Sequence, residues 1–150
     1  MQLAEFRNGV ITTMRSCKVS YEKLAALVLE GEGVTYLQAM ILYGIYDGLV
    51  TNVSSVSRLF CTEQANASAM CKKLERDGLI VRNRRKDDER VVSLLLTENG
   101  RTVLHNLEVK LHKWDSFLES LMPQTLETIL AGLTEGERVI RGLTEIQLRE

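Results

Sequence analysis

The segment from Leu74 to Gly100 constrains the fold of this chain more than any other part of the sequence. A helical pattern ends at Gly78, and two short apolar stretches follow it. The run Arg82–Arg90 between these stretches is strongly charged, as is typical of an exposed hairpin. Thr97 then provides a polar N-cap for a new helix. The segment therefore predicts a helix, a β-hairpin tipped with basic residues, and a further helix, an arrangement suited to gripping a nucleic acid backbone.

Composition favours a helical protein. Of the 150 residues, 45% are hydrophobic but only 5% are aromatic, and there is one proline, a balance that suits helices better than a β-sandwich. No apolar run approaches the roughly 18 residues that span a bilayer, and Met1–Arg7 lacks the layout of a signal peptide. Three cysteines without a CxxC pair, namely Cys17, Cys61 and Cys71, fit a reducing compartment. We expect a cytoplasmic protein without membrane segments, structural metal or cofactor.

Charge is concentrated rather than global. The formal net charge is −1, so the whole chain offers no positive field to attract a nucleic acid. Between Lys72 and Arg90, however, eight basic residues face five acidic ones. A DNA-binding protein needs such a local basic patch more than a positive total.

The first half of the chain predicts two helices. Apolar residues step by three and four from Val10 to Val28, and Leu3 extends this seam upstream. Thr35 and Gln38 form a capping box that opens a second helix, from Tyr36 to about Tyr46. The second helix is apolar on nearly every side, which predicts that it is central and buried.

A helix-turn-helix is predicted next. A short helix runs from about Val53 to Phe60, with Leu59 among its inward residues, and Thr62 can cap a following helix that reaches Asp77. Two helices separated by a turn of three or four residues, the second beginning with small and polar residues, are the pattern of this motif.

The C-terminal part predicts two long helices. One runs from Glu98 to about Leu121, and Pro123 can start the last, with a break near Gly132 and a second capping box at Thr134. The apolar seams of these helices and of the first helix need a cover that one protomer lacks. We therefore expect a homodimer, which also suits a pseudo-palindromic DNA site.

With these elements in place, the chain resembles the multiple-antibiotic-resistance regulator (MarR) family of winged-helix repressors. The resemblance covers essentially the whole chain and is most specific in three pieces. These are Leu74-Glu-x-x-Gly78-Leu79-Ile80, Asp88-x-Arg90 and Leu96-Thr97-x-x-Gly100. The chain departs from the family where members often carry Arg in the recognition helix, because Ala69 stands at that position.

The resemblance implies a mostly α fold with a small β-hairpin. Residues 1–150 would form a single protomer, with a winged helix-turn-helix over about 35–100 and dimerisation helices over about 3–30 and 101–149. It also implies a dimeric transcriptional repressor that is released by a small aromatic or phenolic effector.

The predicted DNA contacts lie on the second helix of the helix-turn-helix and on the wing. Asn and Gln can pair with adenine, whereas Lys, Arg and Ser serve phosphates. The resemblance makes Arg90 the tip arginine, which suits a narrow minor groove. Asp88 is expected to brace the hairpin rather than touch DNA. The predicted contacts are Gln64, Asn66, Ser68, Lys72, Lys73, Arg84, Arg85, Lys86 and Arg90.

Cys17 and Tyr21 are candidate effector or redox residues, one helical turn apart. Some members of the family sense organic peroxides with an N-terminal cysteine near tyrosines, and such a thiolate forms a sulfenic acid. The alternative is that Cys17 is a small buried hydrophobe. His105, Glu108 and His112 share a helix face, but the two histidines lie roughly 10 Å apart along the axis and cannot close on one ion alone.

Other function classes find less support in the sequence. G-x-S-x-G, Gly-rich phosphate-loop and H-E-x-x-H motifs are absent, which argues against an enzyme. A winged helix that binds another protein instead of DNA remains an alternative. The sequence leaves open the operator, the regulated genes, the effector, the choice between repressor and activator, and the redox activity of each cysteine.

Overall fold

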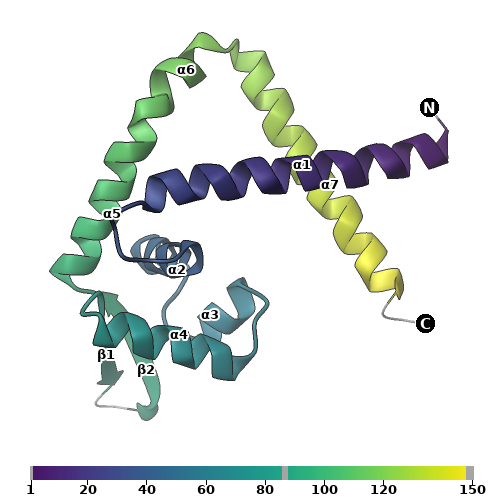
Figure 1. Cartoon of the computed structure of the whole chain (residues 1–150). Coiled ribbons are helices and arrows are strands. Elements are labelled where there is room, and N and C mark those ends of the chain that lie inside the picture. The colour runs from purple at the N-terminus through teal and green to yellow at the C-terminus, as the bar shows by residue number, and fades with distance from the viewer. Residues whose placement is uncertain (1, 86–87, 148–150) are drawn as a thin grey trace. The chain divides into compact units, whose positions relative to one another are not determined.

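The computed structural model describes residues 2–85 and 88–147 (Figure 1). The chain divides into two compact units, Met1–Lys110 and Leu111–Glu150, each described here by itself. The first unit contains α1 (Leu3–Leu29), α2 (Tyr36–Tyr46), α3 (Val53–Leu59), α4 (Gln64–Arg76), β1 (Ile80–Arg85), β2 (Asp88–Leu96) and nearly all of α5 (Glu98–Leu111). The predicted fold class is confirmed: the described residues are mostly helical, with a two-stranded antiparallel sheet.

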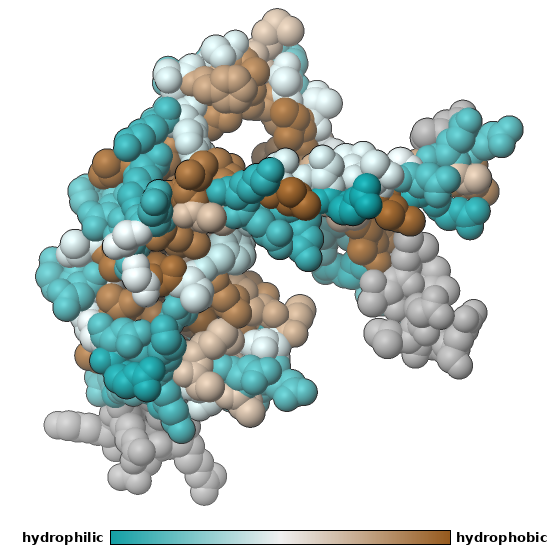
Figure 2. Space-filling view, viewed as in Figure 1, coloured by the Kyte–Doolittle hydropathy of each residue, from teal (hydrophilic) through white to brown (hydrophobic). Residues whose placement is uncertain are grey.

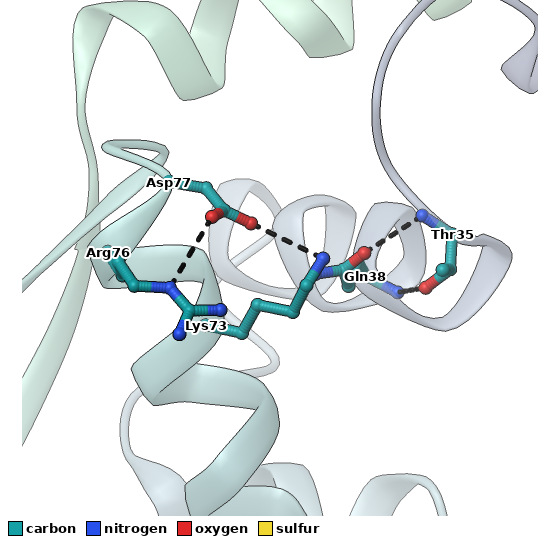
Figure 3. Close-up of polar contacts among 5 residues, drawn as sticks. All are labelled: Thr35, Gln38, Lys73, Arg76 and Asp77. Atoms are coloured by element: carbon teal, nitrogen blue, oxygen red, sulfur yellow. Dashed lines mark hydrogen bonds and ion pairs between the residues drawn. The ribbon is translucent and has the colours of Figure 1, made fainter.

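The helix α2 forms the centre of the first unit, as its apolar sequence predicted. Its cap is the predicted capping box, in which Thr35 N donates to Gln38 Oε1 at 2.9 Å and Gln38 N donates to Thr35 Oγ1 at 3.3 Å (Figure 3). Ile41 and Leu42 are completely buried. The core around them contains side chains from every other element of the unit except α1. The last turn of α1 packs against this core through the partly buried Val28 and Leu29. The other buried core residues are Val34, Ala39, Val50, Val56, Ala67, Cys71, Leu74, Leu79, Ile80, Leu94, Leu104 and Leu107.

A set of short bonds joins the end of α4 to the start of α5. Gly78 has a φ of 72°, a backbone conformation that favours glycine, and it turns the chain from α4 into β1. Thr97 donates its hydroxyl to the Gly78 carbonyl at 2.7 Å and accepts a bond from Gly100 N at 3.0 Å. Thr97 N also donates to the Leu79 carbonyl at 3.1 Å. Thr97 therefore caps α5, as predicted, and also holds both ends of the hairpin together.

The predicted long helix from Glu98 to about Leu121 is interrupted. After α5 comes the 3-10 helix η1 (His112–Trp114), and then α6 (Asp115–Ser120). At this break Asp115 N donates to the His112 carbonyl three residues back, and His112 Nδ1 lies 2.6 Å from Asp115 Oδ2. The local pairing of these two residues favours the tighter turn.

The last helix, α7 (Pro123–Gln147), begins at Pro123 as predicted but has no break near Gly132. The predicted cap at Thr134 is also wrong, because its hydroxyl donates to the Leu130 carbonyl at 2.9 Å within the helix. The cost of one glycine, roughly 1 kcal/mol, is too small to end a helix of this length. Within the described residues, no helix combines the length and apolar character that a membrane crossing requires.

Candidate nucleic-acid interface

The helices α3 and α4 form the predicted helix-turn-helix. Asn52 caps α3 by accepting Ser55 N at 2.9 Å, and the Ser55 hydroxyl accepts Asn52 N at 3.0 Å. In the turn, the Ser57 hydroxyl donates to the Thr62 carbonyl at 2.6 Å, and Thr62 N donates to the Ser57 carbonyl at 3.0 Å. Cys61 has a φ of 46°, an uncommon value for a residue with a side chain. The turn is thus held by both its backbone and its side chains.

Two details of the predicted motif are wrong. Thr62 does not cap α4, because its backbone is used to close the turn, and the N-cap is Glu63, without a side-chain bond. Leu59 was expected to point inward with Val56, but it is 47% exposed. The short α3 turns only Val56 fully into the core.

The helix α4 separates an apolar face from a polar one. Ala67 and Leu74 are completely buried and Met70 is half-buried, so these three residues form the core face of the helix. Cys71 is completely buried on the same face, and burial raises the pKa of its thiol. The residues predicted to contact DNA lie away from this core: Gln64, Asn66, Lys72 and Lys73 are exposed, and Ser68 is half-buried.

Polar contacts already organise part of this exposed face. Gln64 Nε2 donates to Ser54 Oγ at 3.3 Å, which joins the first residue of α4 to α3. At the other end, Lys73 Nζ lies 3.4 Å from Asp77 Oδ2 and Arg76 Nε lies 3.9 Å from Asp77 Oδ1 (Figure 3). The predicted phosphate contact Lys73 is therefore paired with a carboxylate in the free chain.

The hairpin has the predicted form of a wing. Its strands pair antiparallel from Ile80 opposite Leu96 to Arg84 opposite Val92, and the register shifts between Arg84 and Arg85. Lys86 lies outside the described residues, as do the side chains of Arg84, Arg85, Asp88 and Arg90. The predicted roles of these five residues remain predictions.

The base of the wing is joined to the helix-turn-helix. Leu94 N donates to the Thr51 carbonyl at 2.9 Å, and Asn52 forms a β-bridge with Ser93. The Ser93 hydroxyl in turn donates to the Asn83 carbonyl at 3.0 Å. The wing and the cap of α3 therefore share one hydrogen-bonded frame.

Arg82 belongs to the basic patch of the sequence, but no role was predicted for it. Its guanidinium Nη1 lies 4.0 Å from Glu75 Oε2 on α4, and its side chain is only 22% exposed. Its strand position could have predicted this burial. Side chains two positions apart on a strand share a face, and Arg82 follows the buried Ile80 by two positions. Arg82 thus links the wing to α4 and is not a free cation at the surface.

The candidate effector residues Cys17 and Tyr21 lie on α1, and their predicted role stays a prediction. Cys17 is exposed, and the Tyr21 hydroxyl donates to the Tyr36 hydroxyl at 2.8 Å. The two rings meet edge to face with centroids 5.5 Å apart. Partial burial, together with the bond to Tyr36, raises the pKa of Tyr21 to about 12. Sequence reasoning missed Tyr36, whose distance from Tyr21 along the chain hides their contact.

In the part of the chain that the structure describes, no group of three or more His, Cys, Asp or Glu residues could hold a metal ion.

Comparisons with known proteins point to one family. Residues 23–107 match the family model described as transcriptional regulator SarA/Rot. The chain is 30% identical over 80 residues to the HTH-type transcriptional regulator SarZ of Staphylococcus haemolyticus, which covers 53% of this chain and 54% of SarZ. The chain spans about half the length of the curated relatives it matches.

Solved structures agree in fold. A MarR family transcription regulator matches with a TM-score of 0.78 at 18% identity, over 95% of this chain and 97% of the other. The S. aureus MepR–DNA complex matches with a TM-score of 0.70 at 18% identity, over 85% of this chain and 94% of MepR. At this identity the likeness shows the fold alone.

Proposed function

We propose that this chain, which belongs to the SarA/Rot family of transcriptional regulators and has the winged-helix fold of MarR-type regulators, binds duplex DNA through α4 and the β1–β2 wing. The observation that carries the proposal is the exposed polar face of α4 beside a hairpin whose base is bonded to α3. In this proposal the protein is a cytoplasmic regulator and not an enzyme. A relative of the same fold forms a complex with DNA, which supports the choice of partner.

The proposed contacts divide by chemistry. Gln64 and Asn66 are offered as base readers, because their amides present an acceptor and a donor together. Lys72 and Lys73 with the wing residues Arg84, Arg85, Lys86 and Arg90 supply charge for the phosphates and the minor groove, and Ser68 a hydroxyl for a phosphate. Asp88 is proposed to brace the wing.

Dimerisation is the second part of the proposal. On α1, apolar side chains stand in solvent, with Leu3 80% exposed and Leu27 67% exposed, and Figure 2 shows apolar residues at the surface along this helix. On α7, Leu130 is 68% exposed and Leu133 63% exposed. Soluble monomers rarely leave such stretches uncovered, so a second copy is proposed to cover them. Equilibrium sedimentation should find a dimer, and a stable folded monomer at micromolar concentration would contradict this part.

Regulation is the third part, proposed as repression released by a small aromatic or phenolic effector. The proposed place lies among the Cys17–Tyr21 segment, α2 around Met40–Tyr43 and the start of α5. A buried hydroxyl supports a polar ligand there, because the oxygen of the half-buried Tyr43 has no hydrogen-bond partner within the chain as described. A ligand bound at this place would bias the spacing of the two α4 helices of a dimer.

A redox variant is the second candidate, because Cys17 is exposed one turn before Tyr21. Peroxide should then release DNA from the wild type and leave Cys17→Ser bound. Peroxide-insensitive binding by the wild type would remove the redox variant and leave the small-molecule proposal.

The test of DNA binding is a titration of the protein against duplexes that carry the palindromes flanking its own gene. The protein should bind these duplexes more tightly than shuffled duplexes. The logarithm of its binding constant should fall linearly with the logarithm of the salt concentration. If no duplex is bound at low salt, the alternative of a protein-binding winged helix takes the place of this proposal.

A further inference from the structure

We propose that Ser54 is a positioning residue that fixes the Gln64 amide for reading a base pair. The proposal rests on the proposed DNA-binding function and deepens it. Gln64 Nε2 donates to Ser54 Oγ at 3.3 Å, and this side-chain bond crosses from α3 to α4 on the exposed face. Neither residue belongs to the core, so the bond has little to do with holding the two helices together.

Gln64 needs such a partner more than the other predicted contacts. It is the first residue of α4, it is exposed, and its long side chain rotates about several bonds. A freely rotating amide loses conformational freedom when DNA orders it, and this loss weakens both affinity and discrimination. A bond already present in the free protein removes part of that loss.

Ser54 can act as a fixed partner because hydrogen bonds hold the residues around it. Thr51 N and Asn52 N both donate to the Ser55 hydroxyl, at 2.9 Å and 3.0 Å. The Thr51 carbonyl accepts Leu94 N at 2.9 Å, which ties this turn to the wing. Ser54 lies within the capped first turn and therefore moves with the frame that joins the wing to α3.

The chemistry of the bond leaves the reading groups of Gln64 available. Donation to Ser54 uses one of the two Nε2 hydrogens. In this proposal Ser54 takes the hydrogen that points away from Oε1, so that Oε1 and the hydrogen on its own side remain as an adjacent acceptor and donor. Adenine presents the complementary pair in the major groove, its N6 amino group and its N7 atom. The geometry therefore points to adenine at the position that Gln64 reads in each half-site.

The experiment compares the wild type with Ser54→Ala, Ser54→Thr, Gln64→Ala and the double variant Ser54→Ala/Gln64→Ala. Each is titrated against duplexes in which every operator position is changed in turn, and thermal unfolding checks that each protein is folded. Ser54→Ala should lose about fivefold in discrimination for adenine at the Gln64 position, the size expected for one hydrogen bond. Ser54→Thr keeps the hydroxyl and should therefore retain the discrimination for adenine. On the Gln64→Ala background, Ser54→Ala should change nothing.

Three results would overturn the inference. If Ser54→Ala weakens DNA affinity equally in the wild type and in Gln64→Ala, and at every duplex sequence, that result would make Ser54 a phosphate contact. Unchanged base preference in Gln64→Ala would show that Gln64 reads no base, while DNA binding itself would stand. Failure of the wild type to bind any duplex would remove the proposed function together with the inference.

A second readout needs no DNA. In the free wild-type protein, nuclear magnetic resonance relaxation should show an ordered Gln64 side-chain amide. Ser54→Ala should make that amide as mobile as the amide of an unbonded surface glutamine, and Ser54→Thr should restore its order. Equal mobility in the wild type and Ser54→Ala would contradict the positioning role even if base preference changed.

Discussion

A β-carbon placed on Gly100 would lie 2.1 Å from the carbonyl oxygen of Leu79. No real contact of this kind is so short, so α5 can approach the start of the wing only with glycine at this position. The approach lets Thr97 bond to both ends of the hairpin, as described above. The Leu-Thr-x-x-Gly piece of the sequence is thus a packing requirement at the base of the wing.

Gly100→Ala should therefore destabilise the protein strongly, because the neighbouring atom is backbone and cannot rotate away. We expect a loss of about 1–3 kcal/mol or more in the free energy of unfolding, as for other overpacked sites. Urea unfolding measures it. Gly132→Ala on α7 is the matched control, since nothing lies within 4 Å of its added β-carbon. It should raise stability by up to about 1 kcal/mol, and equal effects of the two changes would refute the packing argument.

The Lys110–Glu32 ion pair should make stability depend on pH. Lys110 Nζ lies 2.6 Å from Glu32 Oε1, and its bond to this carboxylate lowers the Glu32 pKa from 4.5, aided by Asn106. Because the folded pKa lies below the ordinary value, the contribution is complete above 4.5 and disappears as the pH falls through the folded pKa. Glu32→Gln should flatten that part of the stability profile.

Urea midpoints from neutral to acidic pH measure this effect. Lys110→Met leaves the Glu32 carboxylate without its cation and should cost about 1–3 kcal/mol at neutral pH. Glu22→Gln is the control, because the exposed Lys18–Glu22 pair contributes little. A profile for Glu32→Gln that parallels the wild type would contradict the assignment.

Arg90→Ala should weaken DNA binding at every sequence, since the wing is proposed to contact backbone and minor groove. The slope of the logarithm of affinity against the logarithm of salt concentration should become shallower by about one. Asn66→Ala should instead relax base preference at one position per half-site, by about 1–3 kcal/mol. Arg7→Ala on α1 serves as a basic control. Wild-type affinity of Arg90→Ala across salt concentrations would exclude the wing contact.

The Tyr21–Tyr36 bond should be visible in alkaline titration. The folded Tyr21 pKa of about 12 means that its contribution to stability is complete below the ordinary value of 10.0 and is lost as the pH rises through 12. Tyr36→Phe removes the hydrogen-bond acceptor and should move the Tyr21 pKa back toward 10.0. Resonances of isotope-labelled tyrosine follow each ring separately. The pKa of Tyr43 is raised mainly by burial, so Tyr36→Phe should leave it unchanged. Tyr43 therefore tests the specificity of the result.

Local sequence rules predicted the elements of this fold well where pattern and cap agree. For α2, the apolar run and the Thr35–Gln38 capping box point to the same start, and the observed helix begins and ends where they place it. The hairpin was similarly marked by Gly78 before it and Thr97 after it. These signals act over a few residues, and tertiary packing did not override them.

The errors lie where contacts from elsewhere in the chain or competing local bonds decide. Thr62 is a residue type that suits an N-cap, but the Ser57 hydroxyl donates to its carbonyl within the turn. The N-cap of α4 is therefore the next residue, Glu63. Ser54 and Tyr36 each acquire their interest from a partner ten or more residues away, which no local pattern reveals. The charge of Arg82 suggests a surface cation, but its place on β1 turns the side chain toward Glu75 of α4.

Cys71 gives this protein a built-in measure of its own opening. A thiol reagent can reach this fully buried side chain only when α4 separates from the core, whereas Cys61 is accessible at all times. Once each rate is divided by the rate of the same cysteine in the unfolded chain, the ratio of the two rates in one native sample is a protection factor. It reports the free energy of the fluctuation that uncovers α4, much as hydrogen exchange does for amides. Two natural cysteines thus supply a probe and its reference without any engineered residue.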